Sequence, residues 1–238
     1  MKTVMIIPTY NEKENIKEVI TRLLALNQKE LYILIVDDNS PDGTADIVRS
    51  LIKKWKKIHL LFRPKGKGRG SACIEGYKKA IEMGAEYIGE MDADLSHHPE
   101  QLPRLQEAIK HADVVLGSRL VKGGKDEGRS YFRTWVTKAS CLYTRTMLGV
   151  KVKDTNSGYR LYKKKIIEQM PWREMKATHH NHVQETLYKM HLMGFKIMEV
   201  PITFSERTKG KSKVTLKHML RGFTTVAKLR LRHLTGQF

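Results

Sequence analysis

The chain has 238 residues, two cysteines and a formal net charge of +19. A chain of this length can bury a core as one domain, and two cysteines are too few for a disulfide framework. No charged, apolar and small-residue signal peptide opens it, and its apolar runs are far shorter than the roughly 20 residues of a membrane span. These features predict a cytoplasmic globular protein that does not cross a membrane unaided.

The positive charge is concentrated in the second half of the chain. Residues 1–119 contain 19 lysines and arginines against 17 acidic residues, whereas residues 120–238 contain 25 against 8. No acidic residue follows Glu206. Such a field attracts polyanions, which include nucleic acid, an anionic membrane and a phosphorylated substrate.

Short β-branched runs alternate with amphipathic stretches through the first half. The pattern predicts strands at residues 4–7, 32–36, 58–62, 87–91 and 114–117, with helices at 16–26, 45–51, 71–83 and 102–109. Strands that alternate with helices predict an α/β fold with a mainly parallel central sheet flanked by helices.

The second half is predicted to be more helical. A stretch rich in glycine and charge at residues 122–128 is typical of a mobile loop. Pro201 limits the strand expected at 196–200 to an edge or an end of the sheet. Helices are predicted at residues 131–148, 184–193 and 215–234. The last is basic and amphipathic, and its pattern fits packing on the core as well as contact with a membrane.

Polar side chains follow three of the predicted strands. They are Tyr10 and Glu12 after the first strand, Asp37 and Asp38 after the second, and Asp92 and Asp94 after the fourth. Ligands of open α/β sheets bind beyond the carboxyl ends of the strands. An aromatic ring can flank a base, and carboxylates can accept hydrogen bonds from a ring N–H or ribose hydroxyls. The joint occurrence predicts a nucleotide pocket, although each segment alone is also an ordinary turn.

Asp92 and Asp94 lie one residue apart at a strand end. Both carboxylates can reach one hard divalent cation there, and a magnesium-sized ion prefers one or two carboxylates together with substrate phosphates. The pair therefore predicts a metal site for a diphosphate-bearing substrate, with a chance Asp-x-Asp as the alternative.

The segment from Lys65 to Ser71 contains three glycines and three basic residues between a strand and a helix. It follows the third strand rather than the first, and its spacing is not that of a dinucleotide fingerprint or a P-loop. We interpret it as a cationic loop near phosphate.

Six segments of the chain resemble those of a known family, in order and over nearly the whole length. They are PTYNE, DDNSPDGT, MDADLSHHP, GSR at 117–119, SGYRLY at 157–162 and VPITFSERTKGKSK at 200–213. The sequence resembles the dolichyl-phosphate mannosyltransferase group of family 2 glycosyltransferases. The resemblance implies a GT-A fold and inverting transfer of mannose from GDP-mannose to dolichyl or polyprenyl phosphate, which leaves GDP.

The resemblance also implies roles for individual residues. The guanosine would contact Pro8, Tyr10, Glu12 and Asp37, with Asp38 and Lys65 in the same nucleotide region, and Asp92 and Asp94 would hold Mg²⁺ or Mn²⁺. The cations around the leaving diphosphate and the lipid phosphate would be Arg119, Arg133, Arg207 and Lys213. Asp94, Arg119 and Arg207 are the predicted catalytic residues.

The sequence departs from the family pattern at two places. Ser96 stands where some relatives place a glutamine ligand, so a third protein ligand for the metal is not assigned. Relatives often have a Phe-Gln-x-Glu pattern where this chain has His182-Val183-Gln184-Glu185, so that Glu185 aligns and Gln184 is displaced by one.

The expected organisation is a catalytic domain at residues 1–206, with a nucleotide-binding half (1–119) and an acceptor-binding half (120–206). Residues 207–238 would form a basic loop and an amphipathic helix. An acceptor phosphate monoester has a second pKa of roughly 6, so it needs no general base at neutral pH. We expect the protein to lie peripherally on the cytoplasmic face of an anionic membrane, with residues 207–232 or a separate anchoring subunit as the attachment.

Two other functions fit parts of the sequence. The same fold could use another sugar nucleotide, such as UDP-glucose, with the same lipid acceptor. The basic half could instead bind nucleic acid, but it lacks the interleaved aromatic residues that stack on unpaired bases, and we expect no nucleic-acid partner.

Overall fold

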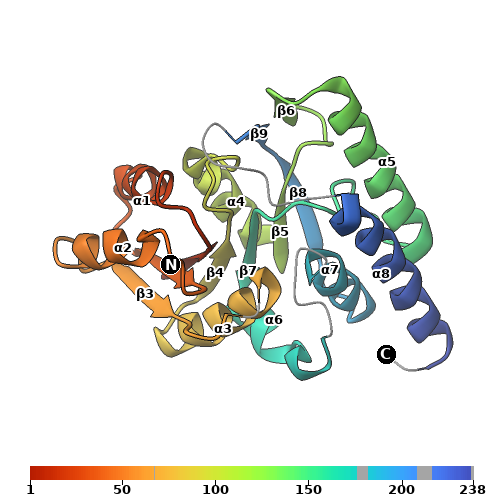
Figure 1. The fold of residues 1–238 in the computed structure, drawn as a ribbon. Helices are drawn as coiled ribbons and strands as arrows, with labels where there is room; N and C mark the ends of the chain where they lie inside the picture. Colours follow the sequence, from red (N-terminus) through yellow and green to blue (C-terminus); the bar gives the residue numbers. More distant parts are fainter. Residues whose placement is uncertain (67, 176–181, 208–215, 237–238) are drawn as a thin grey trace.

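One seven-stranded sheet forms the centre of the protein in the computed structural model, which describes residues 1–66, 68–175, 182–207 and 216–236 (Figure 1). The strand order is β3-β2-β1-β4-β7-β5-β8. The strands are β1 (Thr3–Thr9), β2 (Leu31–Asp37), β3 (Ile58–Phe62), β4 (Tyr87–Glu90), β5 (Val114–Ser118), β7 (Arg160–Lys163) and β8 (Ile197–Pro201). Each strand predicted from the β-branched runs is present, and β8 is an outer strand that ends at Pro201, as predicted.

Strand β7 was not among the predicted strands. It lies antiparallel between β4 and β5, whereas β1 to β4 are parallel to one another and β5 is parallel to β8. The sheet is therefore mainly parallel, as expected, with one reversed strand at its middle. β7 begins inside the segment SGYRLY, and its first residue, Arg160, is in register with Glu90, the last residue of β4.

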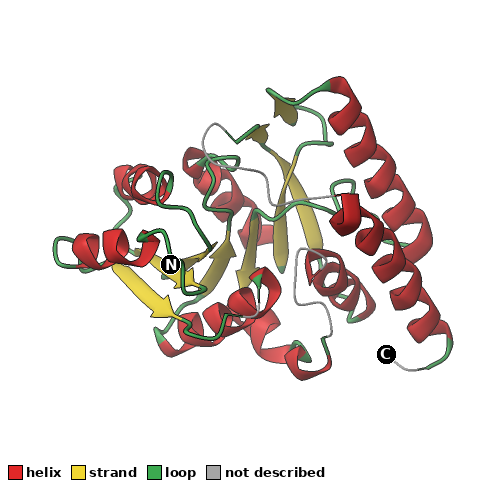
Figure 2. Ribbon diagram, viewed as in Figure 1, coloured by secondary structure: helices red, strands yellow, loops and turns green. Residues whose placement is uncertain are grey.

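Helices cover both faces of the sheet (Figure 2). Alternating residues of β1 point to opposite faces, so Met5 and Ile7 belong to one buried cluster and Val4 and Ile6 to the other. The first cluster contains residues from α1 (Ile16–Ala25), α2 (Thr44–Ile52) and α4 (Leu102–Ala108), and the second contains residues from α3 (Arg69–Glu82), α6 (Lys164–Gln169) and α7 (His182–Leu192).

A third apolar cluster joins the sheet to two long helices, α5 (Tyr131–Leu148) and α8 (Leu216–Leu234). These helices lie side by side (Figure 1), and the ring of Phe223 on α8 packs 5.0 Å from that of Tyr143 on α5. Val226 and Leu229 of α8 are buried in this cluster. The described part of the predicted basic amphipathic helix thus turns apolar residues toward the core.

Residues 122–128 were expected to form a mobile loop, and this expectation is wrong in part. They contain β6 (Lys125–Glu127), which pairs with β9 (Thr203–Ser205) in a small parallel sheet. The partner strand lies almost 80 residues later in the chain, so composition alone could not reveal the pairing. This small sheet brings the second half of the chain over the carboxyl ends of the main strands.

Candidate functional site

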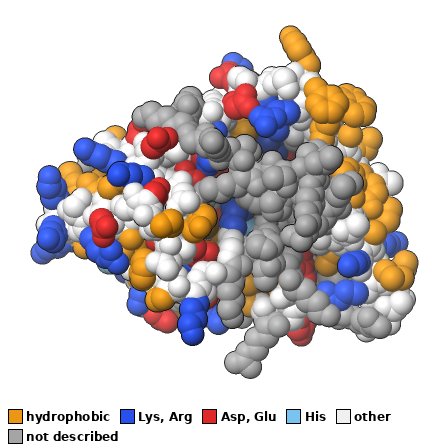
Figure 3. All heavy atoms as spheres, viewed as in Figure 1, with side chains coloured by type: hydrophobic (Ala, Val, Ile, Leu, Met, Phe, Trp, Pro, Cys, Tyr) orange, Lys and Arg blue, Asp and Glu red, His pale blue; other side chains and the backbone are white. Residues whose placement is uncertain are grey.

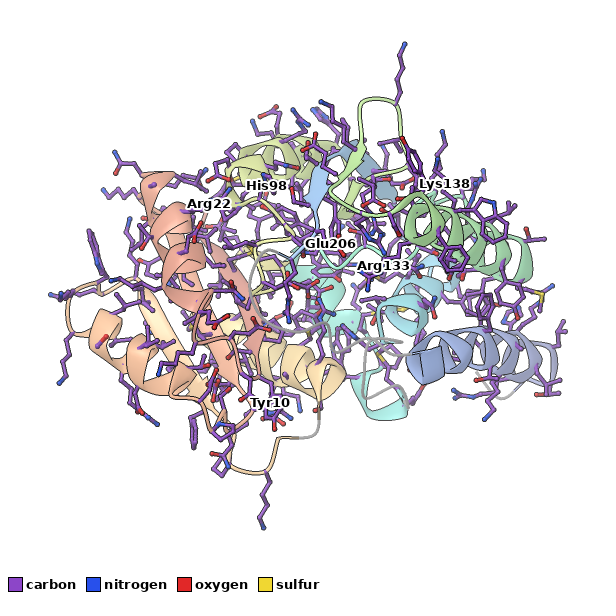
Figure 4. All side chains as sticks on the ribbon, turned by 45° about the horizontal axis from the view of Figure 1, so that its top comes forward. Tyr10, Arg22, His98, Arg133, Lys138 and Glu206 are labelled. Atoms are coloured by element: carbon purple, nitrogen blue, oxygen red, sulfur yellow. The ribbon has the colours of Figure 1, made fainter. Side chains whose placement is uncertain are left out.

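The predicted carboxylates gather at one edge of the sheet because β1, β2 and β4 are parallel and end together. Thr9 is in register with Asp37, and Asp92 follows the end of β4. Asp37 is fully buried, and it accepts hydrogen bonds from Thr9 Oγ1 (2.9 Å) and Ser40 Oγ (2.6 Å). Pro8 lies in β1, and the Tyr10 side chain is half exposed at the end of that strand (Figure 4).

Arg207 connects two of the predicted carboxylates. Its Nη2 atom lies 2.7 Å from Glu12 Oε1 and 3.1 Å from Asp94 Oδ2. Residues from the first strand end, the fourth strand end and the C-terminal region therefore meet at one point. Because one guanidinium satisfies two carboxylates here, the arrangement favours a cation between Glu12 and Asp94.

Asp92 has a different partner, which the sequence did not identify. Arg69, the first residue of α3, donates from Nε to Asp92 Oδ1 at 2.9 Å. Gly158 lies against this pair, since a Cβ atom at this glycine would come within 2.7 Å of Arg69 Nη2 and 3.4 Å of Asp92 Oδ2. Arg69 belongs to the segment 65–71, which was interpreted as a cationic loop near phosphate, and it brings the end of that segment to Asp92.

The turn after Asp92 is tightly held. Ser96 donates to Asp94 Oδ1 from its backbone N–H (3.1 Å) and from its hydroxyl (2.6 Å). Leu95 has a φ of 64°, in the left-handed region that residues with a Cβ rarely adopt. Such strained positions are frequent at binding sites. Ser96 thus orients Asp94.

The remaining predicted nucleotide residues, Asp38 and Lys65, lie beside β3. Asp38 receives hydrogen bonds from Arg63 Nη1 (2.5 Å) and the Gly68 backbone N–H (3.0 Å), which ties the glycine-rich loop to the strand ends. Burial raises the pKa of Asp38, and the charge of Arg63 opposes that effect. Lys65 is exposed in the same loop.

The side chain of Arg119 is 7% exposed and forms a two-point ion pair. Its Nε and Nη2 atoms each lie 2.7 Å from one carboxylate oxygen of Asp154, and its guanidinium lies 4.7 Å from the centre of the Phe204 ring. Burial would raise the pKa of Asp154, but Arg119 outweighs it and holds that pKa below its usual value. The structure therefore fixes Arg119 in place as a permanent cation.

Arg133 and Lys213 were predicted to be cations near the phosphates. Arg133, on the first turn of α5, is half exposed and forms an ion pair with Glu206 (Figure 4). Glu206 directly precedes Arg207, so Arg133 lies near the same segment. Lys213 lies outside the described residues.

A buried polar network underlies the site. Glu90, at the end of β4, accepts hydrogen bonds from Tyr77 (2.7 Å) and Tyr162 (3.1 Å), and Arg160 Nε lies 3.8 Å from its carboxylate. Burial would raise the pKa of Glu90, but a hydrogen bond with His182 and the charge of Arg69 keep it well below its usual range. The network fixes the strand that carries Asp92.

The second place where the sequence departs from the family pattern, His182 to Glu185, forms the start of α7. Gln184 Nε2 donates to Asn156 at 2.9 Å, which places α7 next to the segment before β7. Glu185 is buried and lies 3.7 Å from Arg232 of α8. These contacts connect α7 to the rest of the second half of the chain.

Comparison with known proteins identifies the family. Residues 4–170 match the model of glycosyl transferase family 2. The chain belongs to this family.

Two curated relatives are similar over most of their length. The chain is 39% identical over 215 residues to the undecaprenyl-phosphate mannosyltransferase of Micrococcus luteus, a match covering 90% of this chain and 88% of the relative. It is 34% identical over 233 residues to the polyprenol monophosphomannose synthase of Mycolicibacterium smegmatis, covering 97% and 88%. The chain is accordingly a glycosyltransferase, as its motifs implied.

Solved structures support the expected GT-A fold. A glucosyl-3-phosphoglycerate synthase from Mycobacterium tuberculosis, in complex with Mn²⁺, UDP and glucosyl-3-phosphoglycerate, superposes with a TM-score of 0.68 at 18% identity. That match covers 96% of this chain and 79% of the other. The mannosyltransferase PcManGT from Pyrobaculum calidifontis, in complex with GDP-Man and Mn²⁺, gives 0.58 at 16% identity and covers 89% and 58%.

Proposed function

We propose that this glycosyltransferase transfers mannose from GDP-mannose to a polyprenyl phosphate such as dolichyl phosphate, with inversion. The observation that carries the proposal is the meeting of Glu12, Asp94 and Arg207, where three distant segments place two carboxylates and an arginine within hydrogen-bond distance. The reaction brings together two anions, the leaving diphosphate and the acceptor phosphate. The carboxylates can bind a cation beside the diphosphate, and the arginine can bind a phosphate directly. The two relatives are named as a mannosyltransferase and a monophosphomannose synthase. Their names support mannose as the transferred sugar and a polyprenyl phosphate as its acceptor.

The residues present fit a divalent metal. Asp92 and Asp94 offer hard oxygen donors, and the guanidinium between Glu12 and Asp94 shows that the site accommodates positive charge there. We propose that Asp92 and Asp94 hold Mg²⁺ or Mn²⁺, which would neutralise the leaving diphosphate. Both structural relatives named above contain Mn²⁺.

The protein's own side chains have clear tasks in this reaction. Pro8, Tyr10, Glu12, Asp37 and Asp38 would line the nucleotide side, with Lys65 at its edge. The acceptor phosphate is ionised at neutral pH, so the site must position two anions that repel each other rather than remove a proton. Arg119, Arg133, Arg207 and Lys213 would supply the fixed positive charge, and Asp94, Arg119 and Arg207 would act at the reacting groups.

The lipid acceptor brings the enzyme to a membrane. Among the described residues, no helix is long and apolar enough to span a bilayer. We propose that the protein binds peripherally to the cytoplasmic face of an anionic membrane, alone or with an anchoring subunit. Residues 1–206 would form the catalytic domain, with its nucleotide-binding half at 1–119 and its acceptor-binding half at 120–206, and residues 207–238 its basic extension.

The test is transfer from a panel of radiolabelled nucleotide sugars to polyprenyl phosphate in detergent. GDP-mannose should be the preferred donor, EDTA should abolish transfer, and Mg²⁺ or Mn²⁺ should restore it. A preference for UDP-glucose would select the alternative donor, and transfer that persists without metal would contradict the assignment of Asp92 and Asp94.

A further inference from the structure

Arg129 lies between β6 and α5 and was not among the cations predicted to bind phosphate. Its side chain is 19% exposed, and its Nη1 atom lies 3.2 Å from both Asp126 Oδ2 and Thr137 Oγ1. Within the described ranges of the chain, both hydrogen bonds of this guanidinium use that one nitrogen, and Nε and Nη2 have no hydrogen-bond partner. Figure 3 shows basic and acidic side chains together over β6, beside the start of α5. Arg129 is therefore able to bind an anion through Nε and Nη2.

The ion pair between Arg129 and Asp126 is a one-point contact. Asp126 Oδ2 accepts hydrogen bonds from Arg129 and from the hydroxyl of Thr134, at 3.2 Å each. Asp126 Oδ1 is buried and has no hydrogen-bond partner among the described residues. Arginine and a carboxylate frequently form a two-point pair, as Arg119 and Asp154 do in this protein. Asp126 thus orients Arg129 without occupying its fork.

Phe204 connects Arg129 to the carboxylates of the site. The guanidinium of Arg129 lies 5.7 Å from the centre of the Phe204 ring, and that of Arg119 lies 4.7 Å from it. The ring of His97 packs 5.3 Å from the same ring, and the backbone N–H of Asp92 donates to His97 Nδ1 at 3.2 Å. The two guanidinia and the segment that carries the proposed metal ligands therefore meet around one aromatic side chain.

The start of α5 is unusually positive. Acidic residues stabilise the N-terminus of a helix, because the helix dipole is positive there. The first turn of α5, an 18-residue helix capped by Ser130, has no acidic residue and carries Arg133, and Arg129 directly precedes the cap. Cations at this end of a helix are unfavourable unless negative charge lies nearby. An anion bound to Arg129 would offset this positive charge.

We propose that Arg129 is a further ligand of the acceptor phosphate, which it binds through Nε and Nη2 while Asp126 and Thr137 hold Nη1. The inference rests on the proposed function, because the anion it assigns is the polyprenyl phosphate of that reaction. The donor diphosphate belongs with Asp92 and Asp94, on the other side of His97 and Phe204. The acceptor phosphate is therefore the anion that Arg129 can reach.

The first test is direct binding of farnesyl phosphate, a short prenyl phosphate, to the full chain by isothermal titration calorimetry. Arg129→Gln should raise the Kd about 10-fold, since hydrogen bonds between two charged groups are lost. Arg129→Lys keeps the charge without the fork and should raise the Kd about threefold. Farnesol, which has no phosphate, should bind equally to the wild type and both variants. An unchanged Kd for farnesyl phosphate in Arg129→Gln would overturn the proposal.

Two control variants separate phosphate binding from other effects. Asp126→Asn keeps an oxygen that can accept from Arg129 but removes a negative charge near the phosphate, so the Kd should fall about twofold. If Arg129 only ties β6 to α5, Asp126→Asn should instead weaken binding as much as Arg129→Gln, which would overturn the proposal. Lys125→Gln removes an exposed positive charge from the same strand, β6, and should leave the Kd unchanged. A loss in Lys125→Gln equal to that in Arg129→Gln would show a general charge effect and would also overturn it.

Steady-state kinetics of mannosyl transfer provide the second readout. Arg129→Gln should raise the KM for polyprenyl phosphate about 10-fold and leave the KM for GDP-mannose unchanged, whereas the reverse pattern would place Arg129 at the donor and contradict the assignment. The two proposals fail separately. Binding of farnesyl phosphate through Arg129 in a protein that transfers no mannose would contradict the proposed function alone. Mannosyl transfer with an unchanged acceptor KM in Arg129→Gln would contradict the role of Arg129 alone.

Discussion

Arg119 and Asp154 form a two-point ion pair in which both donor–acceptor distances are 2.7 Å. The backbone N–H of Arg119 also donates to Asp154, at 3.0 Å. A lysine carries one ammonium group and cannot reproduce this fork. Arg119→Lys should therefore lower the rate of mannosyl transfer about 10-fold, which corresponds to about 1.4 kcal/mol. Arg49→Lys, which alters an exposed pair with Asp46, is the control and should leave the rate unchanged.

Asp154 should also make the stability of the protein depend on pH. Its pKa in the folded state lies below the ordinary value of 3.8, so the folded state binds the proton less readily than the unfolded state. Asp154 therefore contributes its full stabilisation at a pH above its pKa in the unfolded state. This stabilisation is lost as the pH falls through its pKa in the folded state. The free energy of unfolding can be measured with denaturant at about pH 7 and about pH 3. Between these two values it should fall less in Asp154→Asn than in the wild type.

Arg207 shares oxygen atoms with the proposed metal site. Arg207→Ala should lower transfer, because it removes a cation from the phosphates, and yet it should raise the affinity for Mn²⁺ in the absence of nucleotide. The affinity for Mn²⁺ should rise about fivefold, because Arg207 no longer competes for the Asp94 carboxylate with an ion pair of about 1 kcal/mol. Electron paramagnetic resonance of free Mn²⁺ measures this affinity directly. Weaker Mn²⁺ binding in the variant would show that Arg207 supports the site in another way.

Gly158 leaves room for the pair between Arg69 and Asp92. An alanine there would place its Cβ atom 2.7 Å from Arg69 Nη2, closer than real contacts allow, so the pair must shift. Gly158→Ala should therefore weaken Mn²⁺ binding at least several-fold without unfolding the protein. Gly222→Ala on α8 meets nothing within 4 Å and is the matched control. Titration of both variants with Mn²⁺ would settle the role of Gly158.

Glu90 balances buried positive charge beneath the site. Glu90→Gln would leave Arg160 buried without its ionised partner, and removal of one member of a buried pair costs about 3 kcal/mol. Urea unfolding should show this loss of stability. Glu82→Gln changes an exposed pair with Lys79 and should alter the unfolding free energy by less than about 0.5 kcal/mol. Equal effects in the two variants would mean that the network around Glu90 is less important than its burial suggests.

Much of the fold could be predicted because its strands are β-branched runs between amphipathic stretches. The carboxylates after β1, β2 and β4 were also predictable, since parallel strands bring their ends to one edge. Strand β7 was missed because its sequence, RLYK, has only two apolar residues between charged ends and no β-branched residue, and β6 was missed because its partner is distant in sequence.

The partners of the site residues could not be predicted in the same way. Asp154 lies in a loop 35 residues from Arg119, and Arg69 reaches Asp92 from the start of another helix. Nothing in the spacing of these residues indicates the contact. Gly158 did lie in a recognised segment, SGYRLY, but only the structure shows that its missing side chain makes room for the ion pair.

The place of β7 in the sheet has a consequence for synthesis on the ribosome. Among the residues that the structure describes, strand β5 pairs only with β7 and β8 in the sheet, so the first 119 residues leave it without a neighbour. The sheet can close around the site only after residue 163 has emerged from the exit tunnel. Until then the facing edges of β4 and β5 carry unpaired backbone N–H and C=O groups, and unpaired strand edges expose a nascent chain to aggregation.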